Sequence, residues 1–218
     1  MKKGDIIWGS VLAIISLALV IPDTREAFVQ LTVNYSYPMS FLKFAVLAIM
    51  GELLAIRITS GDWLRPKGVV AKALTWGIFG MVISLSFGIY SGGVLYCMST
   101  GYLPAAAGFI GALLTAFFIS LTMNVSFGPI MMATHRITDT YIDRKVDRLG
   151  GGVHACVEAV DWISFIKFVV FKTIPRFWIP AHTLVFLLPP EFRVLAAAYL
   201  SIALGGLMAI AKKKAASK

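Results

Sequence analysis

Residues 69–98 read VVAKALTWGIFGMVISLSFGIYSGGVLYCM, and residues 104–133, after a short break, read PAAAGFIGALLTAFFISLTMNVSFGPIMMA. Each run holds 30 residues with at most one charge, whereas a membrane-spanning helix needs only about 20. The apolar residues are continuous and do not alternate with polar ones, which argues against the strands of a membrane β-barrel. These two runs therefore predict long, tilted transmembrane helices.

The composition of the whole chain agrees with this prediction. Of 218 residues, 58% are hydrophobic and 14% are charged, against roughly 45–50% and 25% in soluble domains. The net charge of +9 reflects few acidic residues and not dense basic tracts, so it does not indicate a nucleic-acid partner. The 2 cysteines exclude a disulfide scaffold and a cysteine-rich metal site. We predict an all-α integral membrane protein, with residues 1–218 forming one transmembrane domain in the lipid bilayer.

Apolar runs along the chain predict a bundle of about six helices, one of them broken by prolines. The expected spans are 6–21, 41–58, 69–98, 104–133, 177–188 and 193–211. The modest amphipathic pattern of residues 157–172 predicts a cytosolic helix that lies at the membrane interface. Pro175 then bends the chain into the short fifth span, for which a re-entrant segment is the alternative. We interpret 6–21 as a retained helix and not a cleaved signal peptide, because no small-residue cleavage site precedes Pro22.

The distribution of basic residues predicts the orientation in the membrane. If the amino terminus faces the cytosol and each run crosses once, all but three of the 20 Lys and Arg residues lie on the cytosolic side. The exceptions are Arg25, Lys43 and Arg193. Both termini are then cytosolic. We favour the plasma membrane of a bacterium, with an organellar membrane as the alternative.

Small residues recur at every fourth position in the two longest runs, which permits close helix packing in lipid. The sets are Gly80, Ser84, Gly88 and Gly92 in the first, and Gly108, Ala112, Ala116, Ser120, Asn124 and Gly128 in the second. We expect the middle of each set to join these two helices. Gly88 and Gly92 also permit a homo-oligomer. A chance distribution in a glycine-rich protein is the alternative.

Polar side chains at membrane depth are costly, so they are the candidates for a pore or a solute-binding site. They are Glu52, Arg57, Asn124, His135, Arg136, Asp139 and His182. Each has a structural alternative. Glu52 is either protonated or paired with a cation from another span. Arg136 and Asp139 form a local helix pair. His182 satisfies a carbonyl freed by Pro180. No catalytic or cofactor-binding motif is present, and two ligands such as His135 and Asp139 do not make a metal site. We therefore expect neither an enzyme nor a cofactor.

The C-terminal third resembles the peroxisomal membrane protein 22 family, which includes the mitochondrial inner-membrane Mpv-type proteins. The resemblance rests on the segment FWIPA at 177–181 and on Phe186, Pro189 and Arg193, followed by a last apolar helix; Val185 stands where the family has Asn. Upstream, Gly51-Glu52 is similar to the family's Gly-Asp, and Arg57 lies near its Gln. Asn124, Phe127 and Pro129 are similar to its Asp-Gln…Phe-x-Pro segment, with Met123 in place of the Asp. The family's Pro-x-x-His-x-Trp-Tyr element is represented only by Tyr90.

The resemblance implies a small membrane protein whose relatives are described as pores for small solutes, without enzyme activity. The sequence thus leads to two hypotheses. In the first, the protein is a small-solute channel or transporter whose pathway Glu52, Asn124 and His182 line, with His135 and Arg136 forming a basic vestibule. In the second, it is a membrane scaffold or a lipid- or partner-binding protein, and its polar residues only hold the helices together.

Overall fold

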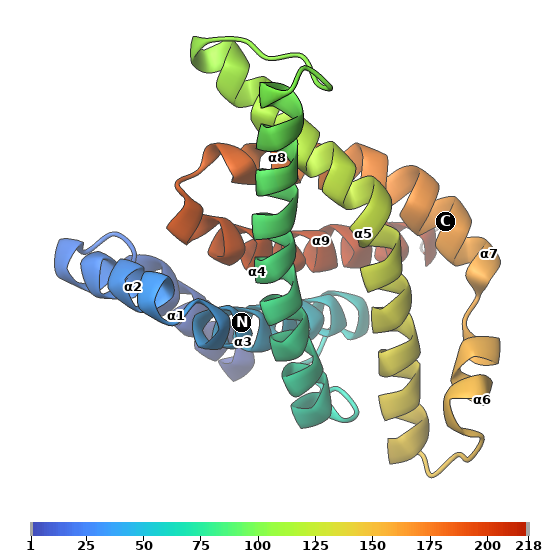
Figure 1. Ribbon diagram of the computed structural model, residues 1–218. Helices are drawn as coiled ribbons and strands as arrows, with labels where there is room; N and C mark the ends of the chain where they lie inside the picture. The colour runs from blue at the N-terminus through green and yellow to red at the C-terminus, as the bar shows by residue number, and fades with distance from the viewer. Residues whose placement is uncertain (1, 217–218) are drawn as a thin grey trace.

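The computed structural model describes residues 2–216, and every regular element in that range is a helix (Figure 1). Four of the described helices are long and apolar enough to cross a membrane. They are α3 (Ser36–Ser60), α4 (Val69–Ser99), α5 (Gly108–Val146) and α9 (Pro190–Ala216). The all-helical prediction is confirmed, and each of these helices extends past at least one end of the apolar run that predicted it.

The predicted N-terminal run 6–21 forms a shorter helix, and a second helix that was not predicted follows it after a sharp bend. α1 (Lys3–Leu17) ends before the predicted limit at residue 21, and α2 (Pro22–Asn34) leaves it at an angle of 83°. Pro22 starts α2 because proline lacks an N–H and therefore fits the unbonded first turn of a helix. The pair is apolar enough to be one broken span.

The largest departure from the sequence prediction lies between α5 and α9. After the short helix α6 (Gly152–Ala159), the chain is continuously helical through α7 (Trp162–Ser164), the π-helix η1 (Phe165–Trp178) and α8 (Ile179–Leu187). The predicted break at Pro175 is wrong, because this residue lies inside η1. The π-type hydrogen bonds re-satisfy the carbonyl groups that a proline leaves unbonded.

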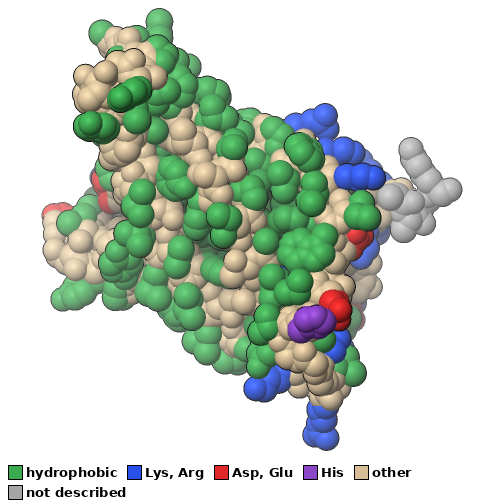
Figure 2. Space-filling model, turned by 45° about the vertical axis from the view of Figure 1, so that its right-hand side comes forward, with side chains coloured by type: hydrophobic (Ala, Val, Ile, Leu, Met, Phe, Trp, Pro, Cys, Tyr) green, Lys and Arg blue, Asp and Glu red, His purple; other side chains and the backbone are tan. Residues whose placement is uncertain are grey.

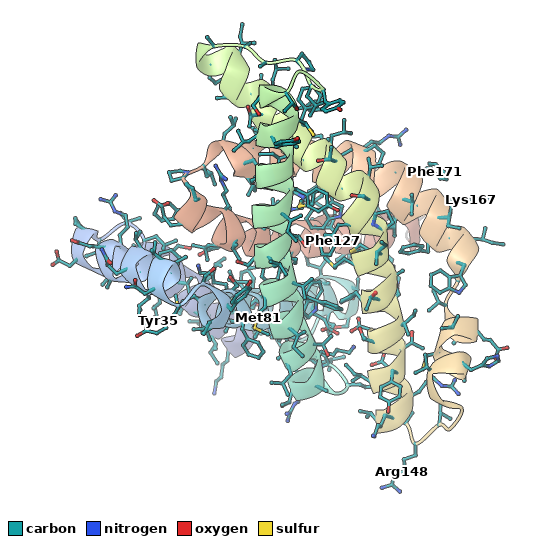
Figure 3. All side chains as sticks on the ribbon, viewed as in Figure 1. Tyr35, Met81, Phe127, Arg148, Lys167 and Phe171 are labelled. Atoms are coloured by element: carbon teal, nitrogen blue, oxygen red, sulfur yellow. The ribbon has the colours of Figure 1, made fainter. Side chains whose placement is uncertain are left out.

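The predicted amphipathic face of this region packs against α5. Phe165 and Val169 of η1 are buried and line a small pocket with Arg136 of α5. Lys167 and Phe171 point outward from η1 (Figure 3), and Phe171 is 70% exposed. The segment therefore lies alongside the bundle over its whole length, and the interfacial helix predicted for 157–172 is not a separate element.

Several basic segments meet at one end of the bundle, which we call the basic end: it holds the end of α3 and the start of α4. Asp5 of α1 bonds to Arg57 of α3, and Lys213 of α9 lines the same surface pocket as this pair. Lys67, before α4, pairs with Asp147 beyond α5. In Figure 2 the Lys and Arg side chains gather along the right and lower edges, while the upper left is mostly hydrophobic.

The helices form two groups that α4 joins. α3 packs against α9 and α4, whereas α5 packs against α8 and η1, and α4 contacts both α3 and α5. In Figure 1, α4 and α5 run alongside each other, with α3 and α9 behind α4. Within residues 2–216, neither α3 nor α9 packs extensively against α5. The cavity described below lies between these two groups of helices.

The small residues pack differently from the sequence prediction. Gly80 of α4 faces Ser40 and Phe44 of α3, and the Ser120 hydroxyl of α5 donates to the Ile179 carbonyl of α8. In the first set Ser84 also contacts α3, through Ser36, so the prediction that the middle of this set joins α4 to α5 is wrong. A Cβ atom added at Gly88 or Gly92 would meet nothing within 4 Å, so both positions face outward and leave a homo-oligomer through them as a prediction.

Candidate functional site

A cavity of about 440 Å³ lies between the two helix groups. Residues of α3, α4, α5, η1, α8 and α9 line it. Figure 3 shows Phe127 of α5, one of the lining residues, in the space between α4 and α5. Most of the wall is apolar, but polar side chains lie at two levels. Besides Ser201 of α9, they are Glu52, Asn124, His135, Arg136, Asp139 and His182.

The first polar level contains Glu52, about two turns from the end of α3 at the basic end. Its Oε1 lies 3.1 Å from Nζ of Lys72 in α4, and the same Nζ lies 3.1 Å from Oδ1 of Asp143 in α5. The Lys72 side chain is only 8% exposed, whereas that of Glu52 is 28% exposed because it borders the cavity. Lys72 thus links three helices, and its two carboxylate neighbours offset the cost of burying its charge.

Sequence reasoning missed Lys72. It was counted with the cytosolic basic residues and not among the site candidates, but it lies in the first turn of α4 beside the cavity residue Glu52. The signal was present, because Lys72 is the one charge inside the apolar run 69–98. Such a residue in a membrane helix usually faces a partner or water.

His135 and Asp139 lie next to this ion-pair cluster on α5. His135 Nε2 is 3.5 Å from Asp139 Oδ2. This ring nitrogen of His135 is buried and has no hydrogen-bond partner. The imidazole ring lies 4.4 Å from the ring centre of Trp76 in α4. Arg136 follows in sequence and lines the cavity as well. The predicted vestibule residues therefore do gather at one end of a cavity, but together with acidic partners.

The second polar level lies deeper, where α8 runs beside α5. The Asn124 side-chain amide lies 3.0 Å from Nδ1 of His182 and donates to the Ser120 carbonyl at 2.8 Å. The His182 ring stacks on Trp178, with ring centres 5.1 Å apart. The indole Nε1 of Trp178 is buried without a hydrogen-bond partner. This end of the cavity therefore offers hydrogen-bonding groups without a carboxylate.

The structure places the seventh candidate, Arg57, outside the cavity. Its Nε lies 2.7 Å from Oδ1 of Asp5 in α1, and the Trp63 indole donates to the same oxygen at 2.8 Å. Beside them, Lys2 pairs with Asp62 at 2.9 Å. Hydrogen bonds from Lys2 and from the Trp63 backbone N–H lower the pKa of the Asp62 carboxyl. Arg57 therefore anchors α1 to α3 instead of lining a pathway.

Within the described residues, no group of three or more His, Cys, Asp or Glu side chains is arranged to hold a metal ion. His135 and Asp139 remain a pair, and the nearby Glu52 is bound to Lys72. Cys97 and Cys156 are both free thiols. What the site offers is thus a largely apolar chamber with one ionic level and one hydrogen-bonding level.

Comparison with known proteins assigns no family: no family model matches the chain, and no curated protein or solved structure matches it. The function must therefore be argued from the geometry of the cavity.

Proposed function

We propose that the protein is a small-solute channel or carrier whose pathway runs through this cavity. The observation that supports it most is the gathering of six acidic, basic, amide and imidazole side chains, from three separate segments of the chain, on one cavity of about 440 Å³. This volume falls in the range of roughly 300–1,000 Å³ that small-molecule sites occupy. A purely structural polar network needs no space beside it.

The arrangement of helix ends supports a topology with six crossings and both termini on the cytosolic side. α1 and α9 meet α3 at the basic end. Since α5 ends there and α9 begins at the other end, η1 and α8 must lead the chain across between them. Basic residues favour the cytosolic side, so the basic end is the cytosolic end. We place the protein in the plasma membrane, with an organellar membrane as the alternative.

The resemblance to the peroxisomal membrane protein 22 family leads to the same proposal. Four of the upstream positions that carry it border the cavity: Gly51, Glu52, Asn124 and Phe127. Trp178, from the C-terminal signature, borders it too. Membership of this family is part of the proposal.

The test is solute efflux from liposomes that contain the purified full-length protein. Gly128 borders the cavity, and a Cβ atom added there would lie 3.6 Å from Ile174 and 3.8 Å from Asn124, which is ordinary contact. The Gly128→Leu side chain therefore fills the cavity without displacing backbone. We expect wild-type protein to release entrapped glycerol faster than protein-free liposomes, and Gly128→Leu to return the rate close to theirs.

Gly93→Leu is the matched control, because it adds the same side chain to a span glycine that has nothing within 4 Å and that lies outside the Gly88 and Gly92 pair. It should release glycerol at the wild-type rate. Efflux that is the same with wild-type protein, with Gly128→Leu and without protein would refute the proposal.

A scaffold is the second candidate, and the ion-pair cluster favours it. Lys72 joins α3, α4 and α5 through Glu52 and Asp143, which is what a purely structural role of Glu52 requires. Under this hypothesis the polar residues set the stability of the bundle, and no variant alters efflux. The Gly128→Leu experiment separates the two candidates.

A further inference from the structure

The ionic level of the cavity carries an excess of negative charge. Three carboxylates gather there, those of Glu52, Asp139 and Asp143, and they lie close enough to repel one another. The cations near them are Lys72 and Arg136. One carboxylate therefore has no cationic counterpart at this level, which is costly at membrane depth.

The geometry identifies which carboxylate has no direct ion pair with Lys or Arg, since Lys72 and Arg136 act on Asp139 only at longer range. Nζ of Lys72 is shared between Glu52 and Asp143, at 3.1 Å from each. Asp139 has His135 Nε2 at 3.5 Å, and in the described part of the chain no Lys or Arg nitrogen lies within ion-pair distance of it. The Asp139 side chain is 29% exposed and borders the cavity. The carboxylate without a direct ion pair thus faces the space that a ligand would fill.

The walls of the cavity suit the apolar body of such a ligand. Trp76 borders it next to His135, with Phe44 stacked beside it, and Phe127 and Trp178 are further aromatic residues of the wall. Aromatic faces attract cations, and Met131 and Met132 provide adaptable apolar surface. An anion would meet the surplus carboxylate instead.

We infer that the cavity binds an apolar organic cation, with its charge beside Asp139 and Glu52 and its apolar groups against Trp76 and Phe127. This inference rests on the proposed function and names the class of solute. The bound cation supplies the positive charge that the ionic level lacks. The hydrogen-bonding level at Asn124 and His182 receives the far end of a longer molecule.

The test compares two ions of the same shape and opposite charge. Tetraphenylphosphonium and tetraphenylborate are added to the full-length protein in lipid nanodiscs, and saturable binding is measured by equilibrium dialysis. We expect the phosphonium cation to bind and the borate anion to bind more weakly. Asp139→Asn and Glu52→Gln should each weaken cation binding by about tenfold, because each removes a full charge close to the ligand.

Asp147→Asn is the matched control, since it removes a carboxylate from the same end of the bundle but outside the cavity, where Asp147 pairs with Lys67. It should leave the affinity unchanged. Asp139→Asn breaks no ion pair with Lys or Arg, so its unfolding midpoint should stay near that of the wild type. Equal phosphonium affinity in wild type and Asp139→Asn, or tighter binding of the borate anion to the wild type, overturns the inference.

The failure of this inference differs from the failure of the proposed function. If Gly128→Leu stops glycerol efflux while Asp139→Asn leaves phosphonium binding unchanged, the cavity conducts solutes but is not a cation site. If phosphonium binding depends on Asp139 while efflux equals that of protein-free liposomes, the cation site stands and transport does not.

Discussion

Gly51→Leu is expected to lower the free energy of unfolding by about 3 kcal/mol, the upper part of the usual range for overpacking. Gly51 lies where α3 crosses α9. A Cβ atom added there would lie 2.8 Å from the backbone oxygen of Ser201, and one added at Gly205 would lie 2.9 Å from the Gly51 oxygen. Because the obstacle is backbone on both sides, a larger residue must push the helices apart. In lipid, such close contact is what holds helices together.

The measurement is the unfolding midpoint of the purified protein in detergent. Gly93→Leu serves as the control, because this glycine lies in a span of similar hydropathy and has no atom within 4 Å of an added Cβ. Its midpoint should be close to that of the wild type. An equal decrease in the unfolding midpoint for both substitutions would show that α3 and α9 are not tightly packed where they cross in the purified protein.

Lys72→Met is expected to destabilise the protein by about 2 kcal/mol. The usual loss for breaking one side of a buried ion pair is about 3–5 kcal/mol. The smaller value follows because Glu52 is 28% exposed beside the cavity and so keeps part of its hydration. The substitution leaves Glu52 without a cation, while methionine conserves most of the lysine side-chain volume.

Adding Glu52→Gln to Lys72→Met should restore most of the lost stability, since the uncompensated charge is then removed. Lys67→Met is the control: it also breaks a lysine–aspartate pair, but both side chains are exposed, by 59% and 40%. Exposed pairs contribute under about 1 kcal/mol. A double variant no more stable than Lys72→Met alone would contradict the role assigned to Glu52.

Much of the candidate site was predictable, because a polar residue in an apolar run is visible without a structure. Glu52, Asn124 and His182 stand out in this way, and all three border the cavity. Lys72 was missed because it lies near the start of its run, where a charge is easily assigned to a loop. Arg57 was predicted as a site residue because it lies inside the apolar run 41–58. Its partner is Asp5, 52 residues earlier in the chain, and this distant contact cannot be read from the run itself.

The sequence by itself determined the helical class, the positions of the long spans and which residues are too polar for lipid, because hydropathy and helix length are local properties. Only the tertiary structure decided what those residues contact. It paired Glu52 with Lys72, turned Gly88 and Gly92 outward and kept the helix unbroken through Pro175. The physical reason is that helix rotation and partner choice depend on packing between distant segments, which no local pattern of residues fixes.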